Sequence, residues 1–283
     1  ACKSCHGPAE AHVAFHRNPL NRYTHRTSDA YDASIVNPAK LDAEGSSEAC
    51  GQCHGVFITR EEFAMKYARD GIQYRPGKDL DAFRYYIQHP ATSGNPEDAE
   101  DLKRNPDFYD QRWWPDGTIL AGGREYTAMV VTGCYLEGEM SCLSCHTMHG
   151  GDPKDQLIPG LTEQQMCVQC HDATRFTSDL QSHTHHAPDS SGSSCVNCHM
   201  PNKAYALLGA IRSHQIDAPN LRSSAELGVP NACNLCHLDQ TLEWTNQHLS
   251  ERWDYDPVPL SEEQRAVSAA LLWLLKGDAA QRA

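Results

Sequence analysis

The sequence predicts a mainly α-helical protein with little regular secondary structure, and with one short β-hairpin at most, in the region 115–135. Only 40% of the 283 residues are hydrophobic, and the chain holds 19 glycines and 16 prolines, so it is poor in side chains for a large aliphatic core. Helix-start signals recur along the chain. A five-residue cysteine and histidine pattern is repeated six times, which predicts many short turns and few sheets.

The charge balance excludes several classes of protein. The chain has 24 basic and 37 acidic side chains, a formal net charge of −13, whereas a nucleic-acid-binding protein would need a basic patch. No run of about 18 apolar residues is present, so the chain is not expected to span a membrane. We also find no basic segment followed by an apolar segment of the kind that forms an export signal.

Twelve of the 13 cysteines lie in six copies of the pattern Cys-x-x-Cys-His. A chain of this composition would contain about 0.03 such patterns by chance. The cysteine pairs are Cys2 and Cys5, Cys50 and Cys53, Cys142 and Cys145, Cys167 and Cys170, Cys195 and Cys198, and Cys233 and Cys236. The histidines that follow them are His6, His54, His146, His171, His199 and His237.

This pattern indicates covalent attachment of haem c. The two thiols add to the two vinyl groups of one haem, and the next residue, histidine, binds the iron from the proximal side. Zinc ribbons do not need a histidine after every second cysteine, and a disulfide framework would show varied spacings. We therefore predict six covalent haems. Cys134, outside the pattern, is interpreted as a buried free thiol, with a redox or ligand role as the alternative.

The predicted porphyrins supply the apolar mass that the side chains lack. Residues 1–255 are expected to form one hexahaem domain wrapped around them, with a haem-free insert at about 55–140. Residues 256–283 are expected to form a C-terminal helical segment, interpreted as the start of a truncated helical repeat region.

Local signals place several elements within this frame. In the insert, Thr59–Glu62 predicts a capping box that opens a helix to about Arg69, and residues 80–89 predict a second helix. The segment 113–117 predicts a turn, followed by the hairpin at 119–131.

The C-terminal half carries three further helix signals. A capping box at 162–165 and a cap at Asp239 predict two helices, the second of which ends near Trp253. A capping box at 261–264 predicts a last helix that ends before Gly277. Its apolar stripe consists of Val267, Leu271, Leu272 and Leu275.

Ten histidines lie outside the six motifs and could bind an iron on its distal side. Methionine is the rival ligand, but Met148 and Met200 lie too close to a motif histidine to reach the same iron, which favours bis-histidine ligation for most haems. His12, His149 and His214 are the preferred candidates, and His186 is preferred over its neighbours His183 and His185. His16 and His25 are further candidates, whereas His89 and His248 are interpreted as surface or propionate-binding residues.

Three segments resemble the multihaem cytochrome c superfamily that includes the tetrahaem carrier of bacterial hydroxylamine oxidation and its octahaem relatives. The element His-Gly-Pro-x-x-x-His-Val at 6–13 is similar to the family pattern in which the second histidine ligates another haem. The segment 195–201, with Arg212-Ser-His214, resembles a late haem motif and its distal ligand. The segment 230–237, followed by Trp244, resembles a subgroup that is often fused to helical repeats.

Haems with both axial positions filled cannot bind a substrate, but they can pass single electrons. We therefore expect an electron carrier, acting as a wire or as a subunit of a larger redox assembly or filament. The expected partners are other redox proteins or further cytochrome subunits. The alternative is a multihaem oxidoreductase that acts on a small nitrogen or sulfur oxyanion at one open haem. Because haem is attached to this motif after export, the protein is expected to be periplasmic or extracellular.

Overall fold

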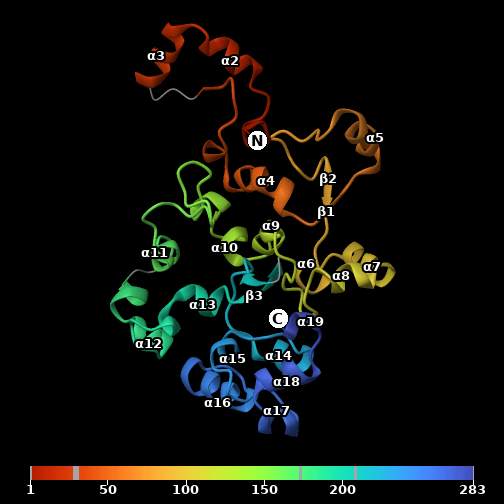
Figure 1. Cartoon of the computed structure of the whole chain (residues 1–283), viewed down its shortest axis with the longest axis vertical. Helices are drawn as coiled ribbons and strands as arrows, with labels where there is room; N and C mark the ends of the chain where they lie inside the picture. Colours follow the sequence, from red (N-terminus) through yellow and green to blue (C-terminus); the bar gives the residue numbers. More distant parts are fainter. Residues whose placement is uncertain (1, 28–31, 172–173, 207–208, 283) are drawn as a thin grey trace. The chain divides into compact units, whose positions relative to one another are not determined.

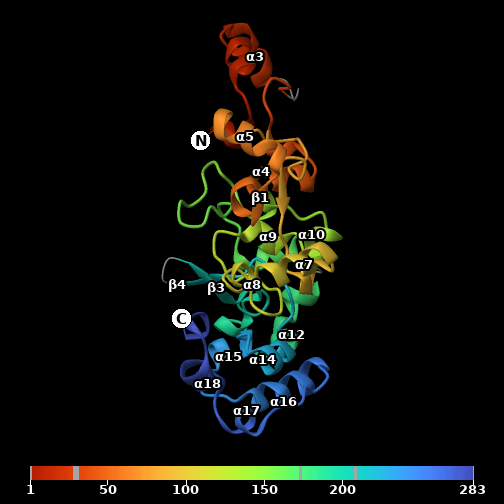
Figure 2. The same cartoon turned by 90° about the vertical axis from the view of Figure 1, so that its right-hand side faces the viewer.

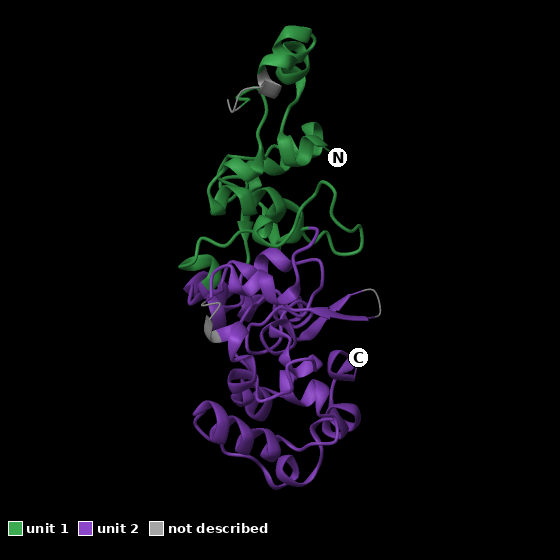
Figure 3. Cartoon of the chain, turned by 90° about the vertical axis from the view of Figure 1, so that its left-hand side faces the viewer, with its two compact units in different colours: residues 1–87, 134–158 green, residues 88–133, 159–283 purple. Residues whose placement is uncertain are grey.

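The computed structural model describes residues 2–27, 32–171, 174–206 and 209–282. The chain divides into two compact units: unit 1 consists of residues 1–87 and 134–158, and unit 2 of residues 88–133 and 159–283 (Figure 3). The first three Cys-x-x-Cys-His motifs belong to unit 1 and the last three to unit 2. Each unit therefore carries three predicted haem attachment sites.

Unit 1 consists of short helices and one small sheet (Figure 1). The strands β1 (Phe57–Thr59) and β2 (Arg84–Tyr86) pair antiparallel, with Ile58 opposite Tyr85. The helices are α1 (Cys2–His6), α2 (Glu10–His16), α3 (Pro19–Thr27), η1 (Pro38–Lys40), α4 (Ala43–His54), α5 (Glu61–Asp70), α10 (Gly133–Leu136, which begins at the unit boundary) and η2 (Cys142–Ser144).

Helix α4 is packed against this sheet at its C-terminal end. Arg84 of β2 donates a hydrogen bond to the Gln52 carbonyl, and its guanidinium lies 3.8 Å from the centre of the Phe57 ring. Gly55 follows the helix, and a Cβ at this position would collide with the ring of Tyr86. The second motif, at the end of α4, is therefore held by contacts on the side away from its cysteines.

Two predictions for this part of the insert need correction. The helix expected over 80–89 is wrong, because residues 84–86 form β2 and pair with β1. The capping box at Thr59 is also wrong, because Thr59 is the last residue of β1, and α5 begins at Glu61 with no side-chain cap. Pairing between β1 and β2, a long-range contact, therefore replaces the helix expected over 80–89 and the cap expected at Thr59. The helix expected to end near Arg69 forms as α5.

Unit 2 contains the remaining helices and a second two-stranded sheet (Figure 2). The strands β3 (Asn202–Ala206) and β4 (Gly209–Arg212) pair antiparallel, with Tyr205 opposite Ala210. The helices are α6 (Pro90–Ser93), α7 (Pro96–Arg104), α8 (Pro106–Asp110), α9 (Glu125–Met129), α11 (Glu163–Val168), η3 (Thr174–Ser178), α12 (Leu180–Thr184), η4 (Ser191–Ser193), α13 (Cys195–His199), α14 (Leu221–Leu227), α15 (Ala232–Cys236), α16 (Leu242–Trp253), α17 (Glu262–Ala266), α18 (Ala269–Lys276) and α19 (Ala279–Arg282).

The fold class is confirmed, because helices dominate the described residues and the sheets are small. The hairpin predicted at 115–135 is wrong, however. The predicted turn forms, with the Gly117 N–H donating to the Trp114 carbonyl at 2.8 Å, but only a single bridge joins Trp113 to Ile119. Residues 125–129 then form α9, in which Ala128 and Met129 are buried.

An aliphatic core lies among the last helices of unit 2. Its buried members are Leu221, Leu242, Leu249, Val258, Leu260, Ala269 and Trp273. The predicted capping box at Ser261 forms, but the helix behind it breaks at Val267 and resumes as α18. The predicted stripe is therefore wrong: Ala269 and Trp273 enter the core, whereas Leu271 and Leu275 are exposed.

The cap of α16 is also different from the prediction. Thr241 caps this helix by accepting a hydrogen bond from the Trp244 N–H, whereas the sequence favoured Asp239. The predicted end at Trp253 is correct. In the described ranges, no helix has the length and apolar character needed to cross a membrane.

Glu48, on α4, gives unit 1 a pH-dependent stability. Burial raises the pKa of Glu48 to about 7, although its carboxylate accepts a hydrogen bond from the Leu80 N–H at 3.0 Å. Because the folded-state pKa is raised, the neutral acid contributes stability that is fully present below the unfolded pKa of about 4.3. This contribution is lost as the pH rises through about 7.

We predict that Glu48→Gln makes unfolding less sensitive to pH between 5 and 8, with a gain of about 1–3 kcal/mol at pH 8. Denaturant unfolding at both pH values measures this effect. Glu62→Gln, at an exposed position of α5 in the same unit, is the matched control and should leave the pH dependence unchanged. A Glu48→Gln variant with the wild-type pH dependence would contradict the assignment.

Candidate haem attachment sites

The motifs adopt a single helical turn. In three of them the histidine N–H donates to the carbonyl of the first cysteine: His146 to Cys142 at 3.0 Å, His171 to Cys167 at 3.0 Å, and His237 to Cys233 at 2.8 Å. Residues at positions i, i+3 and i+4 of such a turn lie on one face. The two thiols and the imidazole of each motif are therefore directed to the same side.

In three motifs a residue between the two cysteines is buried, whereas the cysteines and the histidine are not. The twelve motif cysteines and the six motif histidines are half-buried or exposed. In contrast, the intervening residues Gln52, Val196 and Asn234 are 4%, 3% and 0% exposed. Each of these motifs is thus anchored through the residues between its cysteines, and the side that carries the thiols is left for another group to cover.

In unit 1 the motifs are linked directly to one another. Gln52, between Cys50 and Cys53, donates a hydrogen bond to the Ser4 carbonyl of the first motif at 2.8 Å. The thiol of Cys50 hydrogen-bonds that of Cys142 in the third motif, which lowers the pKa of Cys142 and raises that of Cys50. The second motif therefore lies next to both the first and the third.

Unit 2 repeats this arrangement. A hydrogen bond from Cys167, in the fourth motif, lowers the pKa of Cys195, in the fifth, to about 7. Burial raises the pKa of Cys198, and the nearby Cys236 of the sixth motif adds to this effect. The fifth motif therefore lies between the fourth and the sixth.

A buried polar network anchors the sixth motif. The side-chain oxygen of Asn234 accepts hydrogen bonds from Thr245 at 2.7 Å and from Asn231 at 3.0 Å. Its amide nitrogen donates to the Gln240 carbonyl at 3.2 Å. Because Asn234 is fully buried, this network positions α15, which carries both cysteines of the motif.

Three motif histidines are oriented by backbone carbonyls. The Nδ1 atom of His6 lies 2.7 Å from the Val36 carbonyl, that of His146 lies 2.9 Å from the Asp155 carbonyl, and that of His199 lies 2.9 Å from the Asp217 carbonyl. A carbonyl can only accept, so Nδ1 carries the proton and the lone pair of Nε2 remains for a metal.

Three motif histidines face a second histidine. The rings of His6 and His149 are 5.8 Å apart and 2° from parallel, and those of His199 and His183 are 6.2 Å apart and 3° from parallel. The rings of His237 and His186 are 6.0 Å apart with an angle of 34°. Burial lowers the pKa of His237, and the facing His186 ring adds to this effect, which favours the neutral form of His237.

The segment 183–186 reaches two motifs because the chain reverses within it. Helix α12 ends at Thr184, and His185 adopts a left-handed conformation with φ of 55°. His183, before this residue, faces the fifth motif, and His186, after it, faces the sixth. Trp253 stabilises the turn by donating to the His183 carbonyl at 2.8 Å and contacting the His185 ring edge-on at 4.8 Å.

Gly192 allows this approach of His186, because a Cβ at that position would collide with the imidazole ring. No motif in the sequence marks Gly192, Trp253 or Asn234 as a residue that positions a haem attachment site. Their only local signal is their proximity in sequence to a motif or to a candidate histidine. Each acts through a contact that the spacing of cysteines and histidines does not reveal.

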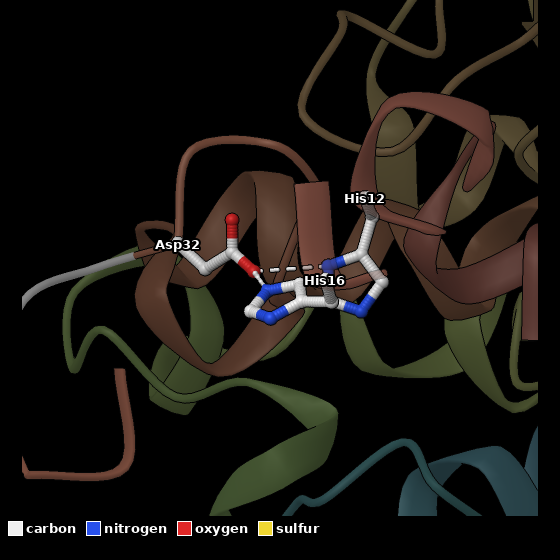
Figure 4. Close-up of side chains that lie close together, drawn as sticks. All are labelled: His12, His16 and Asp32. Atoms are coloured by element: carbon white, nitrogen blue, oxygen red, sulfur yellow. Dashed lines mark hydrogen bonds and ion pairs between the residues drawn. The ribbon is translucent and has the colours of Figure 1, made fainter. Parts of the chain in front are cut away.

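His12 and His16 lie elsewhere in unit 1, where both contact Asp32 (Figure 4). Hydrogen bonds from Ser34, His16 and His12 hold the pKa of Asp32 well below its usual range, although burial alone would raise it. The side chain of His25, a third candidate from this region, falls outside what the structure describes.

The remaining histidines have local contacts. The His214 ring lies 3.3 Å from the Arg212 carbonyl. His89 is buried and caps α6 by accepting the Ala91 N–H at 3.2 Å, and His248 lies 3.9 Å from Glu251. Cys134, predicted as a buried thiol, is half-buried in α10.

Two family models match the chain. The doubled CXXCH motif model matches residues 136–176, and the model of cytochrome c7 and related cytochrome c matches residues 159–238. No curated protein matches the chain.

The fold is similar to that of a solved structure, the outer cell wall cytochrome OcwA. The TM-score is 0.52 and the sequences are 20% identical. The match covers 89% of this chain and 56% of the other, so this chain spans little more than half of that protein's length.

Short helical turns that present paired thiols and a histidine, together with these matches, indicate haem c attachment at the motifs. Residues 136–238 resemble multihaem c-type cytochromes, and residues 159–238 within this segment resemble cytochrome c7.

We predict that Asn234→Ala destabilises unit 2 by about 2–4 kcal/mol, because it removes three hydrogen bonds, two of them to the buried Asn231 and Thr245. Denaturant unfolding followed by circular dichroism measures the loss. Asn105→Ala is the matched control, because Asn105 is exposed and its described side-chain hydrogen bond goes to Asp101 on the preceding helix. This substitution should lower the free energy of unfolding by less than about 0.5 kcal/mol. Equal effects of the two substitutions would disprove the role of the network.

Proposed function

We propose that this chain is an electron-transfer cytochrome that carries six covalently bound haems, three in each unit, most of them ligated by two histidines. The observation that carries the proposal is the set of three facing histidine pairs, His6 with His149, His199 with His183, and His237 with His186. Haem bound in this way supplies reversible one-electron chemistry at its iron.

The spacing of the pairs supports a metal between them. Two imidazole nitrogens bonded at about 2 Å to one metal place their ring centres about 6 Å apart. The three observed spacings are 5.8, 6.2 and 6.0 Å. Rings in direct contact lie closer, as the 4.4 Å between His12 and His16 illustrates. The pairs are therefore separated by the distance that an iron ion requires.

The surroundings of the pairs also fit haem. None of the motif cysteines is fully buried, which leaves room for covalent attachment of a haem. Where Nδ1 of the proximal histidine is bonded to a carbonyl, as in His6 and His199, the tautomer is the one that binds iron through Nε2. An iron bound by both histidines of such a pair would have no free position for a substrate, which favours electron transfer over catalysis.

Neighbouring motifs within each unit support a path for electrons. The second motif adjoins the first and third, and the fifth adjoins the fourth and sixth, through the Cys50–Cys142 and Cys167–Cys195 contacts among others. Groups attached at adjoining points lie close to one another, which favours hopping between them. The three attachment points of each unit are thus arranged in series.

The expected environment follows from the chemistry of attachment. Thioether bonds to haem form after export, so we propose a periplasmic or extracellular location, and a structural relative is described as an outer cell wall cytochrome. The net charge of −13 favours redox partners or further cytochrome subunits that present basic surfaces. Assembly into an oligomer or filament would extend the same function.

The mass and the spectrum of the purified protein test the proposal. The denatured protein should retain six haems by intact mass, and the dithionite-reduced native protein should bind little carbon monoxide. A mass without added haem would disprove the attachment. Extensive carbon monoxide binding would mark open irons and favour an oxidoreductase acting on a small oxyanion.

We predict that His149→Ala opens one iron. The variant should retain six haems, and one of them should become high-spin and bind carbon monoxide, because the ring facing His6 is removed. His89→Asn, which replaces a histidine whose described contacts are with the Ala91 N–H and the rings of Tyr109 and Trp113, is the matched control and should keep the wild-type spectrum. An unchanged spectrum in His149→Ala would contradict the pairing.

A further inference from the structure

We propose that Trp253 is a positioning residue that holds the distal histidines of two haems at once, those attached at the fifth and sixth motifs. This inference rests on the proposed function, in which His183 and His186 bind the irons of these two haems. One side chain at the end of α16 would then set the ligand geometry of two neighbouring redox centres.

The two distal histidines belong to one short turn. Only Thr184 and His185 separate His183 from His186, so a displacement of the turn would move both rings. His185 reverses the chain in a left-handed conformation, with φ of 55°. This conformation is unfavourable for a residue with a side chain, so contacts from outside the turn are needed to maintain it.

Trp253 makes two such contacts. Its indole N–H donates to the His183 carbonyl at 2.8 Å, which fixes the residue before the reversal. Its ring meets the His185 ring edge-on, at 4.8 Å between centres and an angle of 89°, which fixes the residue at the reversal. The side chain of Trp253 is 39% exposed, so it contributes less to the core than to this turn.

Helix α16 connects Trp253 to the proximal side of the sixth motif. In the first turn of this helix, the Trp244 ring lies 4.7 Å from the His237 ring, and Thr245 donates to the buried Asn234 at 2.7 Å. Nine residues of helix separate Trp244 from Trp253, a distance of about 14 Å. The proximal ligand of the sixth motif and the turn that carries both distal ligands therefore contact the same helix.

The angle between facing rings is the property that this arrangement would control. It is 3° between His199 and His183, and 34° between His237 and His186. The relative orientation of two axial imidazole planes influences the g values of a low-spin ferric haem. Electron paramagnetic resonance of the oxidised protein therefore reports ligand geometry, which a loss of stability alone would not change.

The test compares these spectra for the haem-loaded wild type and two variants. Trp253→Phe removes the hydrogen bond and keeps an aromatic ring, whereas Trp253→Ala removes both contacts. Two low-spin signals should shift in each variant, further in Trp253→Ala, with the haem content unchanged by mass. Trp113→Phe is the matched control and should leave every signal in place, because the described ring contacts of Trp113 are with His89, Phe108 and Tyr109.

His183→Ala and His186→Ala assign the two signals, because each should convert one low-spin signal into a high-spin signal. The Trp253 variants must shift these same two signals, and a shift of one or of neither would overturn the proposal. His185→Asn keeps a residue that tolerates the left-handed conformation and should remain fully low-spin. A high-spin signal in His185→Asn would also overturn the proposal, because His185 would then be a ligand.

The same variants separate this proposal from the proposed function. Unchanged spectra in His183→Ala and His186→Ala would refute the ligand pairs on which both depend. High-spin signals in these two variants, with no shift in Trp253→Ala, would uphold the ligand pairs and refute only the positioning role of Trp253.

Discussion

Two thioether bonds and one axial imidazole must reach the same porphyrin from five consecutive residues. One helical turn meets this condition, because the two cysteines and the histidine lie on one face. The opposite face then attaches the turn to the protein, as the buried Gln52 and Asn234 do in their motifs. In these two motifs, a residue between the cysteines is therefore under a packing constraint as strict as that of an ordinary core position.

Attachment of porphyrins through short helical turns also explains why the aliphatic core is small. The described apolar cluster lies among the last helices, from Leu221 to Trp273, whereas the six motifs are spread along the chain up to His237. Around the motifs, the structure relies on hydrogen bonds between short segments, such as that from Gln52 to Ser4. Covalent attachment at short loops would add stability by limiting the entropy of the unfolded chain, as disulfides do.

Several elements that depend on hydrogen bonds between residues close in sequence were predicted correctly. The motif turns, the helix at Thr162 and the capping box at Ser261 depend on local hydrogen bonds, and they form as predicted. Residues 80–89 do not, because Arg84 and its neighbours find partners in β1, more than 20 residues earlier. The contacts between facing histidine rings are also long-range, since His6 and His149 are far apart in sequence. The spacing of residues could therefore mark His149 as a candidate ligand but could not identify the motif histidine that it faces.

The facing histidines connect the electron-transfer chemistry to the fold. His149 follows the third motif and faces the first, so an iron between the two rings would join segments from the two ends of unit 1. His183 and His186 would do the same in unit 2, where one reversed turn serves two neighbouring motifs. Axial bonds of this kind would make each iron a cross-link as well as a redox centre. Ligands held by the fold on both sides of an iron would stay in place on oxidation and reduction, so an electron could move without rearrangement of the chain, which is the property that a rapid carrier requires.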